Sequence, residues 1–244
     1  MRSFGRAIAV ASAVALISGC AAVAPSASAS LPGTPSPTAS AASPDFDGDG
    51  RADLVVGVGA TTPRVSVVYG SGRSQDFTRA DVDGASSYGF GRALLARDLN
   101  TDGYTDLVVS DADESFGQPP GLFFVFGSAS GLQPGKATRV AATGLAGGGA
   151  LALVTAPTLV LAAGATDVDG DGGAVLLYPL GVDGLPSGDP TRLAQGSGGV
   201  PGPGSAGDAF GTTLAASGSL LVVGAGKGRR EGAGRRRDRG ADLR

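Results

Sequence analysis

The 244-residue sequence contains no histidine and no tryptophan, and it has one cysteine and one methionine. Without histidine, a Ser-His-Asp triad and a Cys-His dyad are both excluded. A Cys/His zinc site is excluded for the same reason, and one cysteine cannot form an intrachain disulfide. A phosphate-binding loop is also excluded, because the Leu221–Gly228 segment lacks the serine or threonine that must follow the lysine.

Glycine, in contrast, is abundant, with 43 residues, and long amphipathic helical patterns are hard to find. Such a composition is typical of many short strands joined by glycine-rich turns. The sequence therefore predicts an all-β protein.

Two loops place oxygen-bearing side chains at relative positions 1, 3, 5 and 9. These residues are Asp45, Asp47, Asp49 and Asp53 in the first loop, and Asp98, Asn100, Asp102 and Asp106 in the second. Ca²⁺ prefers six to eight oxygen ligands, and position 7, which is Arg51 or Tyr104, would add a backbone carbonyl. Gly50 and Gly103 at position 6 permit the sharp turn. We expect two structural calcium ions.

Two other interpretations of these loops are weaker. Asp, Asn and Gly are common turn formers, but the same spacing occurs twice here, which favours calcium. An EF-hand needs a glutamate at position 12, where this sequence has Val56 or Val109 inside apolar runs. Each loop therefore leads into a strand rather than a helix.

The first twenty residues predict an export signal, with Arg2 and Arg6 before a short apolar run from 7 to 17. The run ends in Leu-Ile-Ser-Gly-Cys, which resembles a bacterial lipobox and would make Cys20 a lipidated N-terminus. The alternative is ordinary secretion with cleavage after Ala29. We expect a lipid-anchored protein on the outer face of the cytoplasmic membrane, and the membrane would be its first partner.

Beyond the signal, the chain divides into three parts. Residues 21–44 are rich in Ala, Ser, Thr and Pro and predict a disordered tether, and residues 45–226 form the folded domain. Residues 227–244 form a basic tail with three competing interpretations: a disordered arm for anionic polymers or lipid, a merely solvated end, or an out-of-frame product that replaces further repeats. We favour the third, because the tail begins where Leu-Val-Val-Gly-Ala-Gly should continue into another strand.

A short signature recurs four times in the domain, as LVVG at Leu54, LVVS at Leu107, LAAG at Leu161 and LVVG at Leu221. Aromatic or apolar strand signatures follow the first three copies. A Phe-Gly signature precedes the Leu107 and Leu221 copies. Repeats of this length with about four short strands each are typical of propeller blades.

Phe-Gly, the DxDGDGxxD loop and LVVGxG together resemble the FG-GAP repeat of integrin α-chain β-propellers and their bacterial relatives. The resemblance implies a partial β-propeller of about three and a half four-stranded blades. It also implies cation loops at one rim, and ligands at the opposite face or the side. The third and fourth units depart from the pattern, since residues 154–158 and 216–219 replace the cation loop. The turn from Asp167 to Asp171 is interpreted as a polar hairpin turn, with weak cation binding as the alternative.

We expect a non-catalytic, calcium-binding adhesion or ligand-binding scaffold, because no nucleophile–base pair can be identified. The alternatives are the accessory propeller of an extracellular hydrolase or polysaccharide lyase, and a remnant without independent function. The ligand would be a protein or a glycan. Nucleic acid is not expected, since the basic tail lacks interleaved aromatic residues. An open blade edge would permit self-association.

Overall fold

The structure, a computed structural model, describes residues 43–59, 62–113, 117, 119–142, 145, 150–166 and 172–226. The predictions for the signal with Cys20, for tether residues 21–42, for the Asp167–Asp171 turn and for the tail from residue 227 lie outside these ranges. No helix of the described residues is both long enough and apolar enough to cross a membrane.

The described residues form thirteen short strands, a one-turn helix and a 3₁₀ turn. In chain order these are β1 (Leu54–Val58), β2 (Arg64–Val68), β3 (Ser74–Phe77), α1 (Arg79–Asp83), β4 (Phe90–Arg97), β5 (Asp106–Asp111), β6 (Gly121–Val125), η1 (Pro134–Lys136), β7 (Thr138–Ala141), β8 (Leu151–Val154), β9 (Val160–Ala165), β10 (Ala174–Pro179), β11 (Thr191–Leu193), β12 (Phe210–Ser217) and β13 (Leu220–Ala225).

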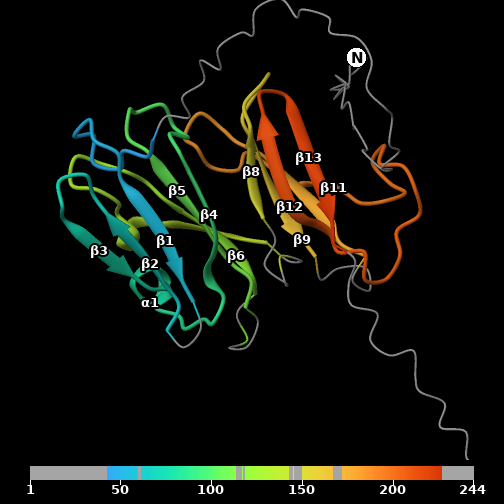
Figure 1. Ribbon diagram of the computed structural model, residues 1–244, viewed down its shortest axis with the longest axis horizontal. Coiled ribbons are helices and arrows are strands. Elements are labelled where there is room, and N and C mark those ends of the chain that lie inside the picture. Colours follow the sequence, from blue (N-terminus) through green and yellow to red (C-terminus); the bar gives the residue numbers. More distant parts are fainter. Residues whose placement is uncertain are drawn as a thin grey trace, which may run out of the picture.

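The strands form four antiparallel sheets, with the orders β1-β2-β3, β4-β5-β6-β7, β11-β10-β9-β8 and β12-β13. Each sheet is a meander of neighbouring strands, and the sheets follow one another across the molecule from β1 to β13 (Figure 1). This arrangement confirms the prediction of an all-β fold made of partial propeller blades. The four sheets are called blades 1 to 4 below.

In blades 2 and 4, the first strand begins with Phe-Gly and pairs with the strand that carries the Leu-Val-Val signature. In blade 2, Leu94 of β4 lies opposite Val109 of β5; in blade 4, Leu214 of β12 lies opposite Val223 of β13. Both pairs also contain a register shift just after the phenylalanine. The two blades therefore use the same pairing, residue for residue.

The blades at the two ends of the array have fewer described strands than the two blades between them. Blade 1 has three strands within the described part of the chain. Its β1 follows an acidic loop directly, as β5 does, and no described strand takes the position that β4 has in blade 2. Among the described residues, which end at 226, blade 4 has the two strands β12 and β13. The predicted total of about three and a half blades is therefore distributed as three, four, four and two strands.

The core lies between the faces of successive blades, because alternate residues of a strand point to opposite faces. Leu107 and Val109 of β5 pack toward blade 1, and the intervening Val108 packs in a second cluster with residues of blade 3. A third, smaller cluster joins blades 3 and 4 around Phe210. Of the aromatic residues in and next to the strands, Tyr69, Phe123, Phe124 and Tyr178 are fully buried and Phe126 is partly buried.

Two glycine contacts repeat at the blade boundaries. A methyl group added to Gly57 of β1 would overlap the carbonyl oxygen of Gly91, and one added to Gly164 of β9 would overlap that of Gly211. Gly91 and Gly211 are the glycines of the Phe-Gly signature, and both have positive φ, at 80° and 97°. The Phe-Gly signature thus lets the backbone of one blade approach the backbone of the preceding blade.

Helix α1 follows blade 1 and was not expected from the sequence. Thr78 and Asp81 form a capping box at its start, and Gly84 ends it in the left-handed conformation. The helix buries Arg79, whose guanidinium lies 2.6 Å from the buried carboxylate of Asp111 in blade 2. A charged pair thereby joins the helix to the neighbouring blade.

Candidate metal centre

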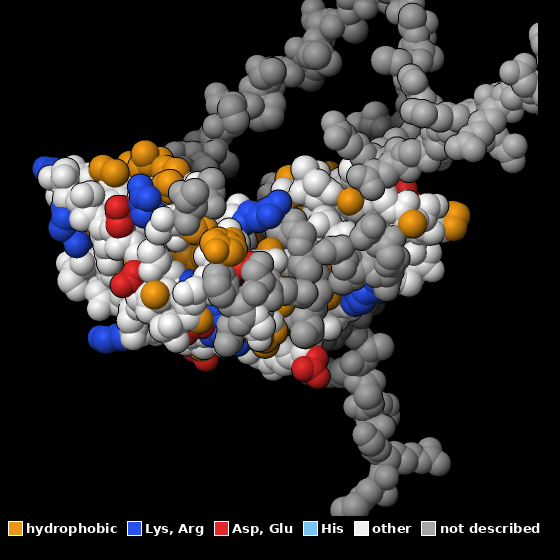
Figure 2. Space-filling view, turned by 90° about the horizontal axis from the view of Figure 1, so that it is seen from below, with side chains coloured by type: hydrophobic (Ala, Val, Ile, Leu, Met, Phe, Trp, Pro, Cys, Tyr) orange, Lys and Arg blue, Asp and Glu red, His pale blue; other side chains and the backbone are white. Residues whose placement is uncertain are grey.

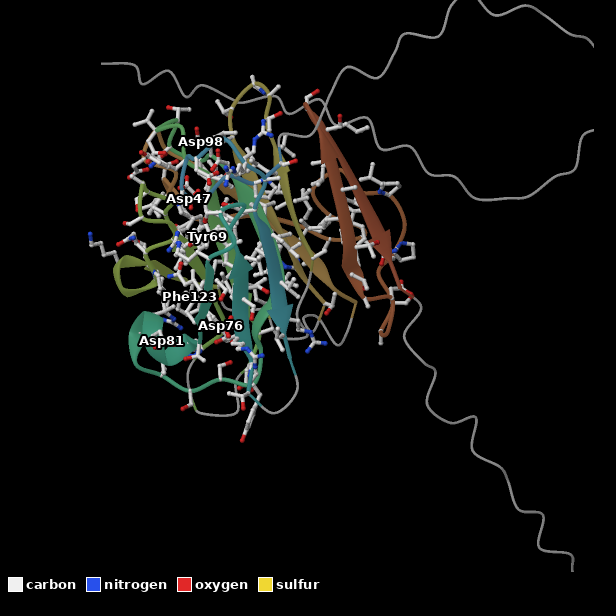
Figure 3. All side chains as sticks on the ribbon, turned by 60° about the vertical axis from the view of Figure 1, so that its left-hand side comes forward. Asp47, Tyr69, Asp76, Asp81, Asp98 and Phe123 are labelled. Atoms are coloured by element: carbon white, nitrogen blue, oxygen red, sulfur yellow. The ribbon has the colours of Figure 1, made fainter. Side chains whose placement is uncertain are left out.

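The two acidic loops lie at the same end of the blades. Loop 1 (Asp45–Asp53) leads into β1, and loop 2 (Asp98–Asp106) joins β4 to β5. Figure 3 shows Asp47 and Asp98 close to each other at this end, and Asp76 and Asp81 at the opposite end. The structure therefore brings together two loops that are separated by about fifty residues in the sequence.

Loop 1 is wound around the carboxylate of Asp45. Its two oxygens accept hydrogen bonds from the backbone N–H groups of Gly48, Asp49 and Gly50, at 2.7, 3.2 and 2.9 Å. Gly48 and Gly50 have φ values of 70° and 81°, which a residue with a Cβ rarely adopts. These glycines allow the loop to turn tightly enough to bring its alternate side chains together.

Three carboxylates converge in this loop. The carboxylate oxygens of Asp45, Asp47 and Asp49 lie within 4.8 Å of one another. Oδ1 of Asp47 is buried and has no hydrogen-bond partner among the described residues. Converging carboxylates repel one another and an unpaired buried oxygen is costly, so the donor set fits a hard divalent cation. The predicted ligand positions 1, 3 and 5 are therefore placed together.

Arg73 is the basic residue beside this cluster. Its guanidinium lies 3.4 Å from Oδ2 of Asp47 and stacks over the ring of Tyr69, 3.7 Å from the centroid. The ion pair with Oδ2 neutralises part of the negative charge of Asp47 and leaves Oδ1 without a partner among the described residues. Sequence reasoning did not identify Arg73, because it belongs to the turn between β2 and β3.

Loop 2 repeats the winding with a less acidic set of side chains. Asp98 accepts hydrogen bonds from the backbone of Thr101 and Gly103, at 2.7 and 3.2 Å. The amide of Asn100 donates to Asp102 Oδ2 at 3.0 Å, and its carbonyl accepts the N–H of Asp102. Because Asn100 is uncharged and is hydrogen-bonded to Asp102, the side chains of loop 2 repel one another less than those of loop 1. A cation would therefore relieve less repulsion in loop 2.

The carboxylates at position 9, Asp53 and Asp106, accept hydrogen bonds from backbone N–H groups. They do not belong to the group formed by Asp45, Asp47 and Asp49. Asp53 accepts the N–H groups of Phe46 and Gly70, at 2.6 and 2.8 Å. Asp106 accepts those of Leu99 and Gly127, at 2.9 and 3.0 Å. Each aspartate therefore ties the start of its loop to the end of the following hairpin.

Burial raises the pKa of Asp106 to about 6, and the charges of Asp102 and Asp98 add to this effect. The two backbone N–H groups oppose the shift, since they stabilise the ionised form. Asp106 is only 1 % exposed, so water stabilises its ionised form very little. A cation close to Asp106 would favour the ionised form further.

The two loops contact each other directly. The backbone N–H of Asp45 donates to Thr105 Oγ1 at 3.0 Å, and the N–H of Thr105 donates to the carbonyl of Asp45 at 2.9 Å. A Cβ on Gly48 would lie 2.6 Å from the ring of Tyr104, so this glycine also makes room for loop 2. These contacts join residues about sixty apart, and no local pattern in the sequence identifies Thr105.

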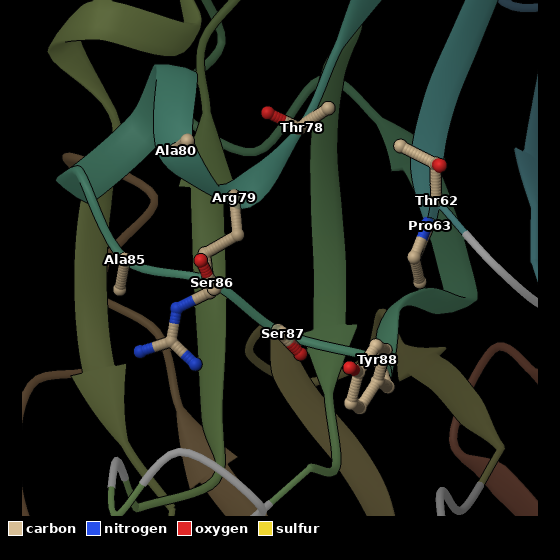
Figure 4. A pocket seen from close by; sticks show the side chains of 9 residues that line it. All are labelled: Thr62, Pro63, Thr78, Arg79, Ala80, Ala85, Ser86, Ser87 and Tyr88. Atoms are coloured by element: carbon tan, nitrogen blue, oxygen red, sulfur yellow. The ribbon is translucent and has the colours of Figure 1, made fainter.

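The opposite end of blades 1 and 2 has a different character. A cavity of about 310 Å³ lies there between the start of β2, α1 and the following loop, and Thr62, Thr78, Ser86, Ser87 and Tyr88 line it with hydroxyl groups (Figure 4). Ser87 donates to Asp111 at 2.6 Å, and Asp111 already pairs with Arg79. On the face shown in Figure 2, acidic and basic side chains are interspersed rather than gathered by sign.

Residues 24–109 match the family described as FG-GAP-like repeat, and this range includes both loops and most of β5. No curated protein matches the chain.

Proposed function

The chain is an FG-GAP repeat protein with a β-propeller-like scaffold, and we propose that it is a non-catalytic, calcium-stabilised binding protein exposed outside the cell. The observation that carries this proposal is the cluster of three carboxylates in loop 1, in which Oδ1 of Asp47 is buried and has no hydrogen-bond partner among the described residues. Calcium is the hard cation that such flexible oxygen sets favour.

Calcium would have a structural role. The side chains of Asp45, Asp47 and Asp49 would hold it in loop 1, and those of Asp98, Asn100 and Asp102 in loop 2. Asp53 and Asp106 would complete the two sets from position 9, each through an oxygen that keeps its backbone hydrogen bond and offers its second lone pair to the ion. The carbonyls of Arg51 and Tyr104 would add ligands from position 7. Because the ligands converge only in the folded loop, the free energy of binding would add to the stability of the fold.

Titration calorimetry on the full chain would test the calcium sites. The unmodified protein should bind two calcium ions, and Asp49→Asn and Asp102→Asn should each remove one. Asp76→Asn is the matched control, because Asp76 is an exposed aspartate at the opposite end whose ion pair with Arg64 involves no loop residue. A stoichiometry of zero, or one that Asp49→Asn and Asp102→Asn leave unchanged, would refute the proposal.

For the ligand, we propose a glycan or a hydroxyl-rich protein surface at the end opposite the loops. The cavity at that end offers several hydroxyl groups, and Tyr88 at its rim is 60 % exposed. An exposed aromatic ring beside hydroxyl groups is a suitable surface for stacking against a sugar. A glycan array probed with the full chain and with Tyr88→Ala should give signals that the substitution weakens; an array without signals would oppose the glycan.

The absence of catalysis and the location of the protein belong to the same proposal. Ser87 has no histidine to activate it, and its carboxylate partner is already paired with Arg79.

Cys20, outside the described residues, would carry the lipid anchor. Fatty-acid labelling of cells that express the chain should be lost with Cys20→Ser, whereas an unlabelled parent protein in the medium would favour plain secretion.

A further inference from the structure

The two acidic loops differ at position 3, which is Asp47 in loop 1 and Asn100 in loop 2. The side chains at positions 1, 3, 5 and 9 therefore include four carboxylates in loop 1, but three carboxylates and an uncharged amide in loop 2. Converging carboxylates repel one another. The repulsion is therefore greater in loop 1 when no cation is bound.

Arg73 lies beside the carboxylate that loop 2 does not have. It belongs to the turn between β2 and β3, and its guanidinium lies 3.4 Å from Asp47 Oδ2. The corresponding segment of blade 2, residues 126–133 after β6, contains no lysine and no arginine. Each loop thus limits the repulsion at position 3 in its own way, loop 2 with an amide and loop 1 with a neighbouring cation.

The position of Arg73 is fixed by its turn and by Tyr69. The N–H of Tyr69 donates to the carbonyl of Arg73 at 2.8 Å, and the N–H of Gly72 donates to the carbonyl of Tyr69 at the same distance. The guanidinium stacks over the buried Tyr69 ring, 3.7 Å from the centroid, and the hydroxyl of that ring accepts the N–H of Leu132 at 3.0 Å. A guanidinium already held on this ring pairs with Asp47 at little further cost in side-chain entropy.

Asp47 keeps one oxygen for a metal ion. Its side chain is 10 % exposed, and Oδ1 is buried without a hydrogen-bond partner among the described residues. An ion bound by Oδ1 would share the carboxylate with the guanidinium, and the two positive charges would repel each other. Because the Arg73 side chain is 44 % exposed, water screens this repulsion and keeps it moderate. The guanidinium therefore opposes a cation in loop 1 without excluding it.

We propose that Arg73 is an internal counter-ion of loop 1 that competes with calcium and thereby sets the affinity of this loop. Without calcium, Arg73 stabilises the three converging carboxylates in the arrangement that binds the ion. With calcium, it repels the ion and lowers the affinity. The inference rests on the calcium binding proposed above, and it adds a residue outside both loops that determines how tightly loop 1 binds.

Calcium titration calorimetry on the full chain with Asp102→Asn would follow loop 1 alone. In this background, Arg73→Gln should bind calcium about two- to fivefold more tightly, the range expected for the loss of a partly exposed ion pair. Arg73→Lys keeps the charge and should bind as the background protein does. Arg64→Gln is the matched control, because the Arg64 side chain is 40 % exposed and pairs with Asp76 at the end opposite the loops.

Urea unfolding of the same variants gives a second readout. In EDTA, Arg73→Gln should unfold at a lower urea concentration than the background protein, because the repulsion in loop 1 is no longer compensated. At a calcium concentration far above both dissociation constants the difference should shrink, since tighter binding adds more stability. If Arg73 only packed on Tyr69, the loss of stability would be the same in EDTA and in calcium.

Tighter binding in Arg73→Gln, with the affinity of the background protein in Arg73→Lys and Arg64→Gln, supports the inference. An affinity that Arg73→Gln leaves unchanged or lowers would overturn it. The same tightening in either of the other two variants, or equal losses of stability in EDTA and in calcium, would overturn it as well. If the Asp102→Asn protein binds no calcium, the proposed function fails for loop 1 and the inference fails with it; a bound ion whose affinity does not respond to Arg73→Gln refutes the inference alone.

Discussion

Replacing Asp53 by alanine would separate its role in the fold from its role as a predicted calcium ligand. The carboxylate of Asp53 accepts two backbone N–H groups, from Phe46 at 2.6 Å in a buried position and from Gly70 at 2.8 Å in a partly buried one. A buried donor left without an acceptor costs about 1–3 kcal/mol. We place the Phe46 donor at the upper part of that range and the partly solvated Gly70 donor at the lower end. The sum is a loss of roughly 3–4 kcal/mol in the free energy of unfolding.

Urea unfolding in EDTA, followed by circular dichroism, would measure this loss without any contribution from metal. Asp53→Asn should lose about half as much, because its amide oxygen still accepts one of the two N–H groups. Asp49→Ala is the comparison within the same loop. Asp49 is exposed and holds only the N–H of Arg51, so in EDTA the change should stay within about 0.5 kcal/mol.

In the presence of calcium, the loss of stability in Asp49→Ala should become visible as well. At a free concentration 100 times the dissociation constant, one site adds about 2.7 kcal/mol to stability. Asp49→Ala should lose this increment from loop 1 while it keeps the stability seen in EDTA. If Asp53→Ala unfolds in EDTA at the same urea concentration as the parent, and differs only when calcium is present, the interpretation of Asp53 as a backbone clamp is wrong.

Two further predictions concern the blades themselves. Gly57→Ala should destabilise the fold by about 1–3 kcal/mol, since its methyl group would overlap the carbonyl oxygen of Gly91, whereas Gly59→Ala, which meets open space, should have little effect in the same urea assay. Tyr178 is 2 % exposed, and burial raises the pKa of its phenol to about 12. The folded state therefore keeps a proton that the unfolded state loses near pH 10, so stability should fall by up to about 3 kcal/mol between pH 10 and 12. Tyr178→Phe should flatten this part of the stability profile and Tyr88→Phe should not; equal slopes in both variants would contradict the assignment.

The sequence alone was sufficient for the fold class and for the positions of the two acidic loops. Both depend on local patterns: alternate oxygens with a glycine at position 6, and apolar runs at a repeating distance. The buried aromatic residues could be predicted for the same reason, because strand residues of this kind pack between blades. Helix α1 was missed, since a five-residue helix held by Thr78 and Asp81 has no periodic pattern to detect.

Only the tertiary structure decided how these parts act on one another. The contact between Thr105 and Asp45, the ion pair of Arg73 with Asp47, and the burial of Arg79 against Asp111 each join residues that are at least 26 positions apart. The same holds for exposure: Leu54 and Leu107 share one local signature, yet one is exposed and the other fully buried. A strand's own sequence specifies what it can pair with, whereas the presence of a neighbouring strand and of a covering blade depends on the rest of the chain.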